Sequence, residues 1–194
     1  MGSRPPADLG ALIVAVSEAL GRAALPHMLI GGQAVLVHGR PRLTEDIDIT
    51  LDCGPERLPD LLTVCADVPL TPLPPDPPAF ARDTFVLPAR HAASGVRVDF
   101  IFSTTPYEHQ AIARAVPTAI ASGSVPIATA EDLLLHKLFA GRPVDIEDAA
   151  AVVRRRGREL DWAYLERWAA EFAGVPGREG LADQVRRLKG PMKT

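Results

Sequence analysis

GGQAVLVHGRPRLTEDIDITLD, residues 31–52, is the stretch that decides the fold. A short apolar run at 27–30 predicts a strand that ends at the pair Gly31-Gly32, and residues 33–38 predict a short helix. Glycine lets the backbone approach a ligand closely, and a helix N-terminus offers free N–H groups to a phosphate. The pattern therefore predicts a strand, a tight turn and a helix placed to bind an anionic group.

Two acidic residues follow on the polar face of a strand predicted at 47–51. Asp46 and Asp48 are two positions apart, so both carboxylates leave the same face. Adjacent carboxylates repel each other unless a cation lies between them, and such hard oxygen ligands suit Mg²⁺. Asp99 lies on the polar face of another predicted strand, 96–102, and three carboxylates on neighbouring strands can hold two ions. The alternative is that these acids only form the solvated face of an edge strand.

The hydrophobic pattern on both sides of this stretch predicts an α+β chain in two parts. Residues 1–128 are expected to form a mixed sheet flanked by helices, and 129–194 a helical region packed on that core. The segment 69–78 contains six prolines and is expected to be a stiff loop, because proline suits neither a helix interior nor a central strand. The remaining elements are expected as helices at 8–25, 55–66, 107–114, 129–141, 145–156, 161–172 and 181–188, and as strands at 84–87, 116–120 and 125–128.

Composition excludes several classes of protein. The 194 residues are 47% hydrophobic and 23% charged with a net charge of −3, which is typical of a globular domain and gives no general attraction for nucleic acid. The apolar stretch 9–16 is too short to span a bilayer, so no membrane partner is expected. Cys53 and Cys65 are isolated, which argues against zinc and favours reduced thiols in the cytoplasm.

Two segments resemble a known family. IGGQAVLVHGRPRLTEDIDI (30–49) resembles the signature of the DNA-polymerase-beta-like nucleotidyltransferase superfamily, a glycine pair followed by Asp-x-Asp, and is similar to the AbiEii-type nucleotidyltransferase toxins. ATAEDLLLHKLFAGRPVDIEDA (128–149) resembles later motifs of the same group, with Lys137, Arg142, Asp145 and Asp148 at the matching positions. The two segments frame about half of the chain.

This resemblance implies a nucleotidyltransferase fold and transfer of a nucleoside monophosphate from an NTP to an acceptor hydroxyl. Mg²⁺, with Mn²⁺ as a substitute, would be bound by Asp46, Asp48 and Asp99. The implied catalytic residues are Asp46, Asp48, Asp99, Lys137 and Asp145, the last as a general base or as an anchor for Lys137. The implied nucleotide-binding residues are Gly31, Gly32, Gln33, Arg42, Thr44 and Lys137.

Several roles stay open at the level of sequence. Lys137 could instead be a surface lysine that covers apolar neighbours, and Asp148 is expected to form an ion pair with Arg142. The acceptor could be tRNA, with a cognate antitoxin as partner, or a small cationic antibiotic contacted by Glu45 and Asp52. A nucleotide-binding module without catalysis is the third alternative, because many members of the superfamily have serine where this chain has Gly32.

Overall fold

The computed structural model describes residues 9–41, 43–44 and 46–190. The chain divides into two compact units, the first formed by 1–33 and 44–127 and the second by 34–43 and 128–194. The sequence pattern did not indicate that 34–43, between two strands of the sheet, would group with the helical part of the chain.

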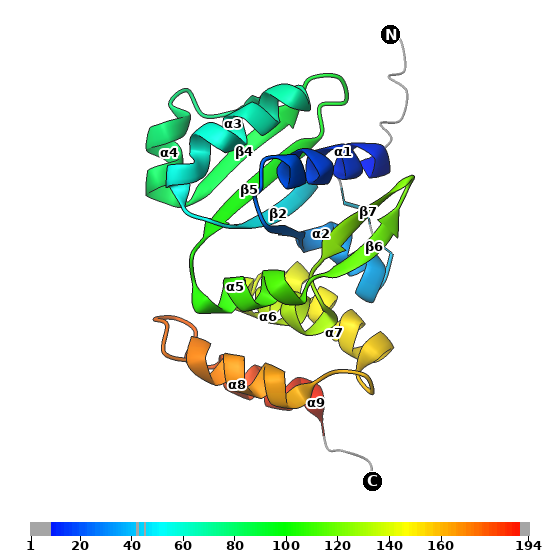
Figure 1. Ribbon diagram of the computed structural model, residues 1–194. Coiled ribbons are helices and arrows are strands. Elements are labelled where there is room, and N and C mark those ends of the chain that lie inside the picture. Colours follow the sequence, from blue (N-terminus) through cyan, green and yellow to red (C-terminus); the bar gives the residue numbers. More distant parts are fainter. Residues whose placement is uncertain (1–8, 42, 45, 191–194) are drawn as a thin grey trace. The chain divides into compact units, whose positions relative to one another are not determined.

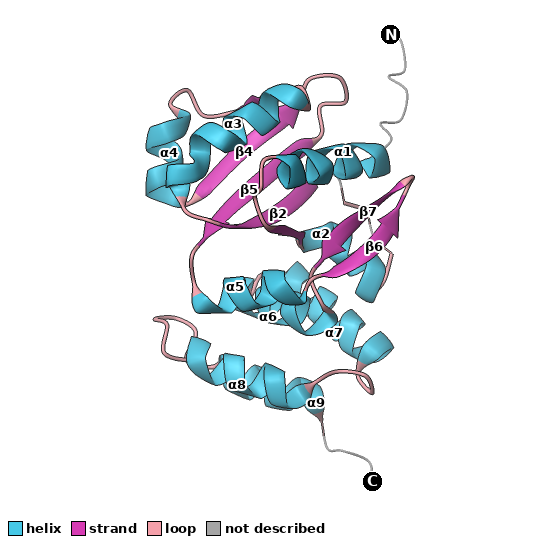
Figure 2. Cartoon of the chain, viewed as in Figure 1, coloured by secondary structure: helices cyan, strands magenta, loops and turns pink. Residues whose placement is uncertain are grey.

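A mixed sheet forms the centre of the first unit (Figure 2). In the part of the chain that the structure describes, the sheet has seven strands in the order β3-β4-β5-β2-β1-β7-β6. β2 pairs with β5 in parallel and with β1 antiparallel, while β1 pairs with β7 in parallel. The predicted α+β class with a mixed sheet is therefore confirmed. The strands are β1 (His27–Leu29), β2 (Asp46–Asp52), β3 (Leu70–Pro72), β4 (Val86–His91), β5 (Arg97–Ser103), β6 (Val116–Ile120) and β7 (Gly123–Ile127).

Alternating apolar residues place the two central strands in the core. Ile47, Ile49 and Leu51 of β2 are buried on one face, and Val98 and Phe100 of β5 are buried beside them. Helices then cover the sheet, with α1 against β6 and β7 and α5 against β2 (Figure 1). The helices of this unit are α1 (Leu9–Arg22), α3 (Leu58–Asp67), α4 (Pro77–Thr84) and α5 (Pro106–Arg114), with a 3₁₀ turn at Pro55–Arg57 before α3, and α2 (Gly31–His38) begins here.

The proline-rich segment 69–78 corrects one prediction. It was expected to be a loop, but Leu70–Pro72 forms the edge strand β3 and Pro77 is the first residue of α4. Both placements suit proline, because an edge strand leaves one N–H unpaired and the first helical turn needs no N–H donor. The strand expected at 84–87 is also displaced, to Val86–His91, since α4 continues through Thr84.

The C-terminal part of the second unit is helical, as the sequence predicted for residues 129–194. This part contains α6 (Ala130–Ala140), α7 (Pro143–Arg156), α8 (Trp162–Phe172) and α9 (Leu181–Lys189). Thr129 caps α6 by accepting a hydrogen bond from the backbone N–H of Asp132, and Gly141 ends it in the left-handed conformation with φ of +71°. None of the helices in the described ranges is long and apolar enough to cross a membrane.

Candidate active site

The three predicted metal ligands lie on neighbouring strands of the first unit. In the parallel ladder of β2 and β5, Asp48 is the register partner of Asp99. Asp46 is exposed and Asp48 is half-buried, two positions apart on β2. Since register partners share a face of the sheet and the pleat repeats every second residue, all three carboxylates leave the same face.

Gly31 closes one side of this acidic face. Its backbone has φ of +64°, a conformation that favours glycine, and it is the first residue of α2. A Cβ atom at Gly31 would lie 1.8 Å from Oδ2 of Asp48, and the Ile30 N–H donates to the Asp48 carbonyl at 2.9 Å. The glycine is therefore required by direct contact with a predicted metal ligand. Its position also starts the helix whose free N–H groups suit a phosphate.

The other predicted nucleotide-binding residues differ in their surroundings. Gly32 is buried in the first turn of α2. Gln33 is buried, and its Nε2 donates to the Asp46 carbonyl at 3.4 Å, so this side chain supports the start of β2. Thr44 is half-buried, whereas Arg42 lies outside the described residues.

Arg97 is a site residue that sequence reasoning missed. It lies two positions before Asp99 on β5 and is the register partner of Asp46. Its Nε–H is shared between Oδ1 (2.9 Å) and Oδ2 (3.0 Å) of Asp99. The hydrogen bond with Asp99, with smaller contributions from Asp46 and Asp48, raises the pKa of Arg97. The signal in the sequence was the period of two, which puts Arg97 and Asp99 on one face.

The donor set of this face fits Mg²⁺ as a partly open site. Within the described ranges, no three His, Cys, Asp or Glu side chains gather closely enough to hold a metal ion by themselves. Mg²⁺ commonly uses one or two carboxylates and completes its shell with water and substrate phosphates. Asp46 and Asp48 are such a pair, and the absence of a side chain at Gly31 lets the Asp48 carboxylate lie against the start of α2.

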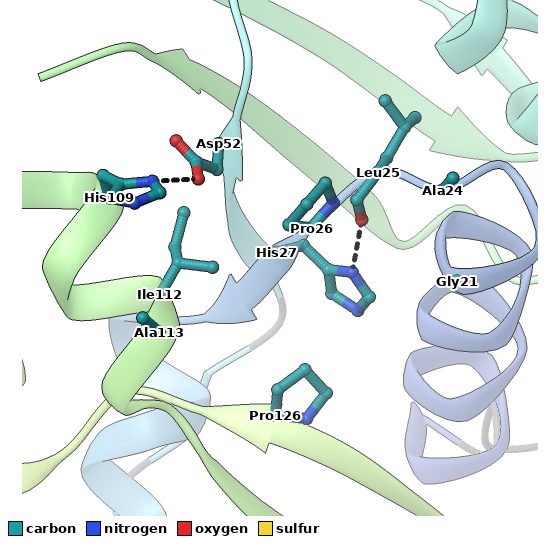
Figure 3. A pocket seen from close by; sticks show the side chains of 10 residues that line it. All are labelled: Gly21, Ala24, Leu25, Pro26, His27, Asp52, His109, Ile112, Ala113 and Pro126. Atoms are coloured by element: carbon teal, nitrogen blue, oxygen red, sulfur yellow. Dashed lines mark hydrogen bonds and ion pairs between the residues drawn. The ribbon is translucent and has the colours of Figure 1, made fainter.

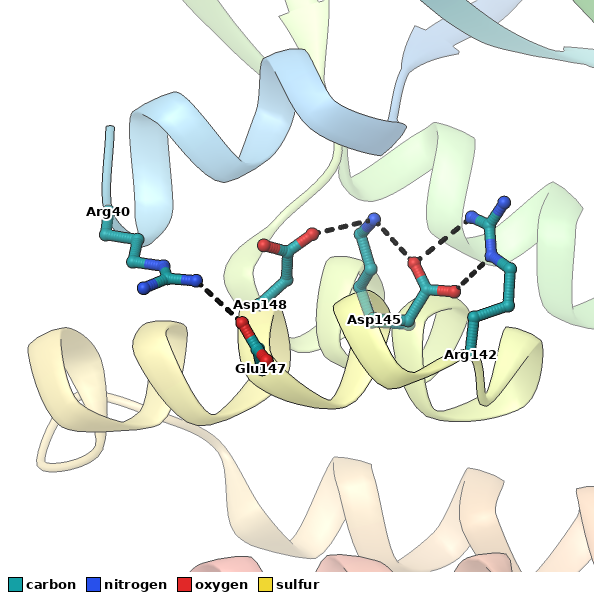
Figure 4. A network of polar contacts seen from close by, with 6 residues as sticks. Arg40, Arg142, Asp145, Glu147 and Asp148 are labelled. Atoms are coloured by element: carbon teal, nitrogen blue, oxygen red, sulfur yellow. Dashed lines mark hydrogen bonds and ion pairs between the residues drawn. The ribbon is translucent and has the colours of Figure 1, made fainter. Parts of the chain in front are cut away.

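The later motif forms a buried charge cluster in the second unit (Figure 4). Nζ of Lys137, a residue with 5% exposure, donates to Asp145 Oδ1 at 2.9 Å and lies 3.1 Å from Asp148 Oδ2. Both carboxylates are fully buried. Burial alone would raise the pKa of Asp145, but the hydrogen bonds from Arg142 and Lys137 outweigh it and hold that pKa below its usual value.

This geometry bears on the roles considered for these residues. Asp145 contacts Lys137, as an anchor for that lysine would, while its role as a general base stays a prediction. The interpretation of Lys137 as a surface lysine is wrong, because the residue is buried. Arg142 pairs with Asp145, and Asp148 pairs with Lys137. The ion pair expected between Asp148 and Arg142 stays a prediction. The lysine reaches inward from α6 to both acids on α7, whose spacing of three residues puts them on one helix face.

Comparison with known families covers both the acidic face on β2 and β5 and the charge cluster on α6 and α7. The model of the nucleotidyl transferase AbiEii toxin family, described as a type IV toxin–antitoxin system, matches residues 18–176. The chain belongs to this family. The match extends through both motifs, and it identifies this AbiEii-family chain as a nucleotidyltransferase.

Solved structures agree with the fold of the AbiEii-family chain. The antibiotic-resistance factor ANT(2'')-Ia matches with a TM-score of 0.59 and 18% identity, over 88% of this chain and 96% of that one. A nucleotidyltransferase-like antigen from Paracoccidioides brasiliensis matches with 0.52 and 15%, over 92% of each chain. The lincosamide adenylyltransferase LnuA matches with 0.50 and 16%, over 73% of this chain and 94% of that one. No curated protein matches the sequence significantly.

The first unit of the AbiEii-family chain also has a pocket where β1 begins and β2 ends, beside His27 and Asp52 (Figure 3). Its volume is about 610 Å³, and its walls are mostly apolar. Asp52 lies here and contacts Nδ1 of His109 at 2.6 Å. From Asp46 to Asp52 the strand rises about 20 Å, so Asp52 is not part of the acidic face at Asp46 and Asp48. Glu45, the other acid considered for a cationic acceptor, lies outside the described residues.

Proposed function

We propose that this chain transfers a nucleoside monophosphate from an NTP to an acceptor hydroxyl with Mg²⁺ bound by Asp46 and Asp48. The observation that carries the proposal is the position of Asp48, which pairs in register with Asp99 and lies directly against Gly31. This arrangement supplies hard oxygen ligands next to a helix N-terminus, the two features that a metal-bound triphosphate requires. Bound Mg²⁺ would neutralise charge on the phosphates.

The remaining residues then have defined tasks. The backbone N–H groups at the start of α2 would bind a phosphate, and Asp99 would complete the acidic face as the third carboxylate. Lys137 directs its ammonium group at two carboxylates.

The test of this function compares two variants with substitutions on one face of β2. The double variant Asp46→Asn, Asp48→Asn should lose Mg²⁺-dependent turnover of labelled NTP, because no carboxylate pair remains on that strand segment. Asp52→Asn removes a carboxylate from the same strand at its other end, and turnover should be retained. Equal turnover in the double variant and the wild type would overturn the proposal.

The family is described as a toxin of a type IV toxin–antitoxin system, which supports a cognate antitoxin as partner. We propose in addition a macromolecular acceptor such as tRNA and a cytoplasmic location. The last turn of α7 carries three arginines, Arg154, Arg155 and Arg156, which offer limited support for RNA binding. Arg155 donates to the Gly39 carbonyl and Arg156 to Glu159, so these two guanidinium groups are already engaged. Incubation with labelled NTPs and total tRNA should label RNA; unlabelled RNA with every NTP would count against this acceptor.

A small-molecule acceptor is the second candidate. It is favoured by the match to ANT(2'')-Ia, which covers nearly the full length of that antibiotic-resistance factor. Mass spectrometry of aminoglycosides and lincosamides after incubation with NTP and Mg²⁺ would detect an added nucleotide. Tight NTP binding without turnover on any acceptor would instead identify a nucleotide-binding module without catalysis.

A further inference from the structure

Four charged side chains form a compact set on the β2–β5 ladder. Asp46 is paired in register with Arg97, and Asp48 with Asp99, so each strand contributes two side chains to one face. Three of the four are acidic. Neighbouring carboxylates on one face repel one another unless a cation lies among them, and the set contains its own cation in Arg97.

The contact of Arg97 with this set is directed at one acid. Its Nε–H is shared by both oxygens of Asp99, at 2.9 and 3.0 Å. The side chain of Asp99 is only 19% exposed, whereas that of Arg97 is 45% exposed. Both oxygens that a metal ion would use on Asp99 therefore face a fixed positive charge.

A second arginine, Arg90, lies directly opposite Arg97 in the sheet. Arg90 on β4 is the register partner of Arg97 on β5, and like charges directly opposite each other in a sheet are unfavourable. Arg90 directs its guanidinium to the Gly95 carbonyl at 2.9 Å, while Arg97 turns to the acids. The acidic face thus offsets the repulsion that this pair of arginines would otherwise experience.

We propose that Arg97 is the resident counter-cation of the acidic face, which holds Asp99 in the metal-free protein and competes with the metal ion for that carboxylate. This inference rests on the magnesium site of the proposed function. Arg97 is a positioning residue, since it acts through Asp99. Its presence stabilises the metal-free protein and weakens metal binding until the substrate phosphates add their own ligands.

Mn²⁺ binding measures this competition directly, through the EPR signal of the free ion. Arg97→Gln should bind Mn²⁺ about five- to tenfold more tightly than the wild type, because a local positive charge has been removed. The metal-free variant should have a lower Tm and a larger rise in Tm with Mn²⁺. Arg90→Gln removes the same charge from the adjacent strand position and should match the wild type more closely in both measurements.

The outcomes separate this inference from the proposed function. Equal Mn²⁺ affinities for Arg97→Gln and Arg90→Gln would overturn the role of Arg97 while leaving the metal site intact. Binding that survives the substitutions Asp46→Asn and Asp48→Asn, or no binding by any variant, would overturn the metal site and this inference with it. Arg97→Lys keeps the charge and should retain an Mn²⁺ affinity near that of the wild type. This variant tests the role of the charge even if the glutamine variant folds poorly.

Discussion

Gly31 and Asp48 are packed so closely that no side chain fits between them: a Cβ atom on Gly31 would lie 1.8 Å from the carboxylate oxygen Oδ2. The two residues come from α2 and β2, and the Ile30–Asp48 backbone hydrogen bond holds these segments together. The conformation of the glycine and the position of the carboxylate are therefore set by the same contact.

Gly31→Ala should abolish transfer activity and weaken Mn²⁺ binding, because the new methyl group would displace the Asp48 carboxylate. The positive φ adds about 1–2 kcal/mol to the cost in stability. Gly177→Ala is the matched control, since Gly177 has φ of +82° and no atom within 4 Å of the added Cβ. It should show the cost of the backbone conformation alone, measured by urea denaturation, with full activity. Normal Mn²⁺ binding by Gly31→Ala would contradict the contact.

Lys137→Met should lower the free energy of unfolding by about 3–5 kcal/mol, because it removes the buried cation that both buried carboxylates contact. Arg142→Met removes the other cation from Asp145, but the Arg142 side chain is 70% exposed. Its loss should cost at most about 1 kcal/mol, as for other solvent-exposed ion pairs. Chemical denaturation of both variants at neutral pH measures the difference, and equal losses would show that burial does not decide the strength of this cluster.

Stability should fall as the pH drops from 7 to 5, in part because of His27. Burial lowers the pKa of His27, whose ring nitrogens contact Ser17 Oγ and the Leu25 carbonyl. Below about pH 6.5 the unfolded chain takes up a proton that the folded chain resists, at up to about 1.4 kcal/mol per pH unit. His27→Gln should reduce this slope, and adding His38→Gln should reduce it further, since burial also lowers the pKa of His38. An unchanged slope in both variants would refute this assignment.

Gly123→Ala should destabilise the first unit by about 1–3 kcal/mol, the usual cost of an overpacked contact. A Cβ atom at Gly123 on β7 would lie 2.4 Å from Cγ1 of Val14 on α1. In a Val14→Ala background that methyl group is gone, so Gly123→Ala should cost clearly less. A double-mutant cycle by thermal denaturation measures the coupling. Additive losses would mean that the contact with Val14 is not what makes Gly123→Ala costly.

The sequence predicted secondary structure best where the hydrophobic residues follow a single period or a local signal marks the end of a helix. The alternation in β2 and β5 predicted both strands, the common face of Asp46 and Asp48, and the polar face that carries Asp99, because a strand repeats every second residue. The cap at Thr129 and the stop at Gly141 predicted the ends of α6 for equally local reasons. Strand order and register could not be predicted, since they depend on pairing between segments far apart in the chain.

Partner choice was the least predictable property. Arg142 has two acids within reach on α7, and the sequence does not show that the buried Lys137 takes Asp148 and shares Asp145. Arg97 was missed for a similar reason, because an arginine in a strand has no role until its cross-strand neighbours are known. The proline segment 69–78 was read from composition, which cannot distinguish a loop from an edge strand followed by a helix that begins with proline.

The parallel pairing of β2 with β5 also bears on when the protein becomes functional during folding. Asp48 and Asp99 are register partners although about fifty residues of chain separate them. Contacts of such long range form slowly, because the closure of the intervening loop must precede any gain from pairing. A chain still being synthesised can therefore not assemble this acidic face until β5 has emerged and paired, which delays competence for catalysis until the sheet is complete.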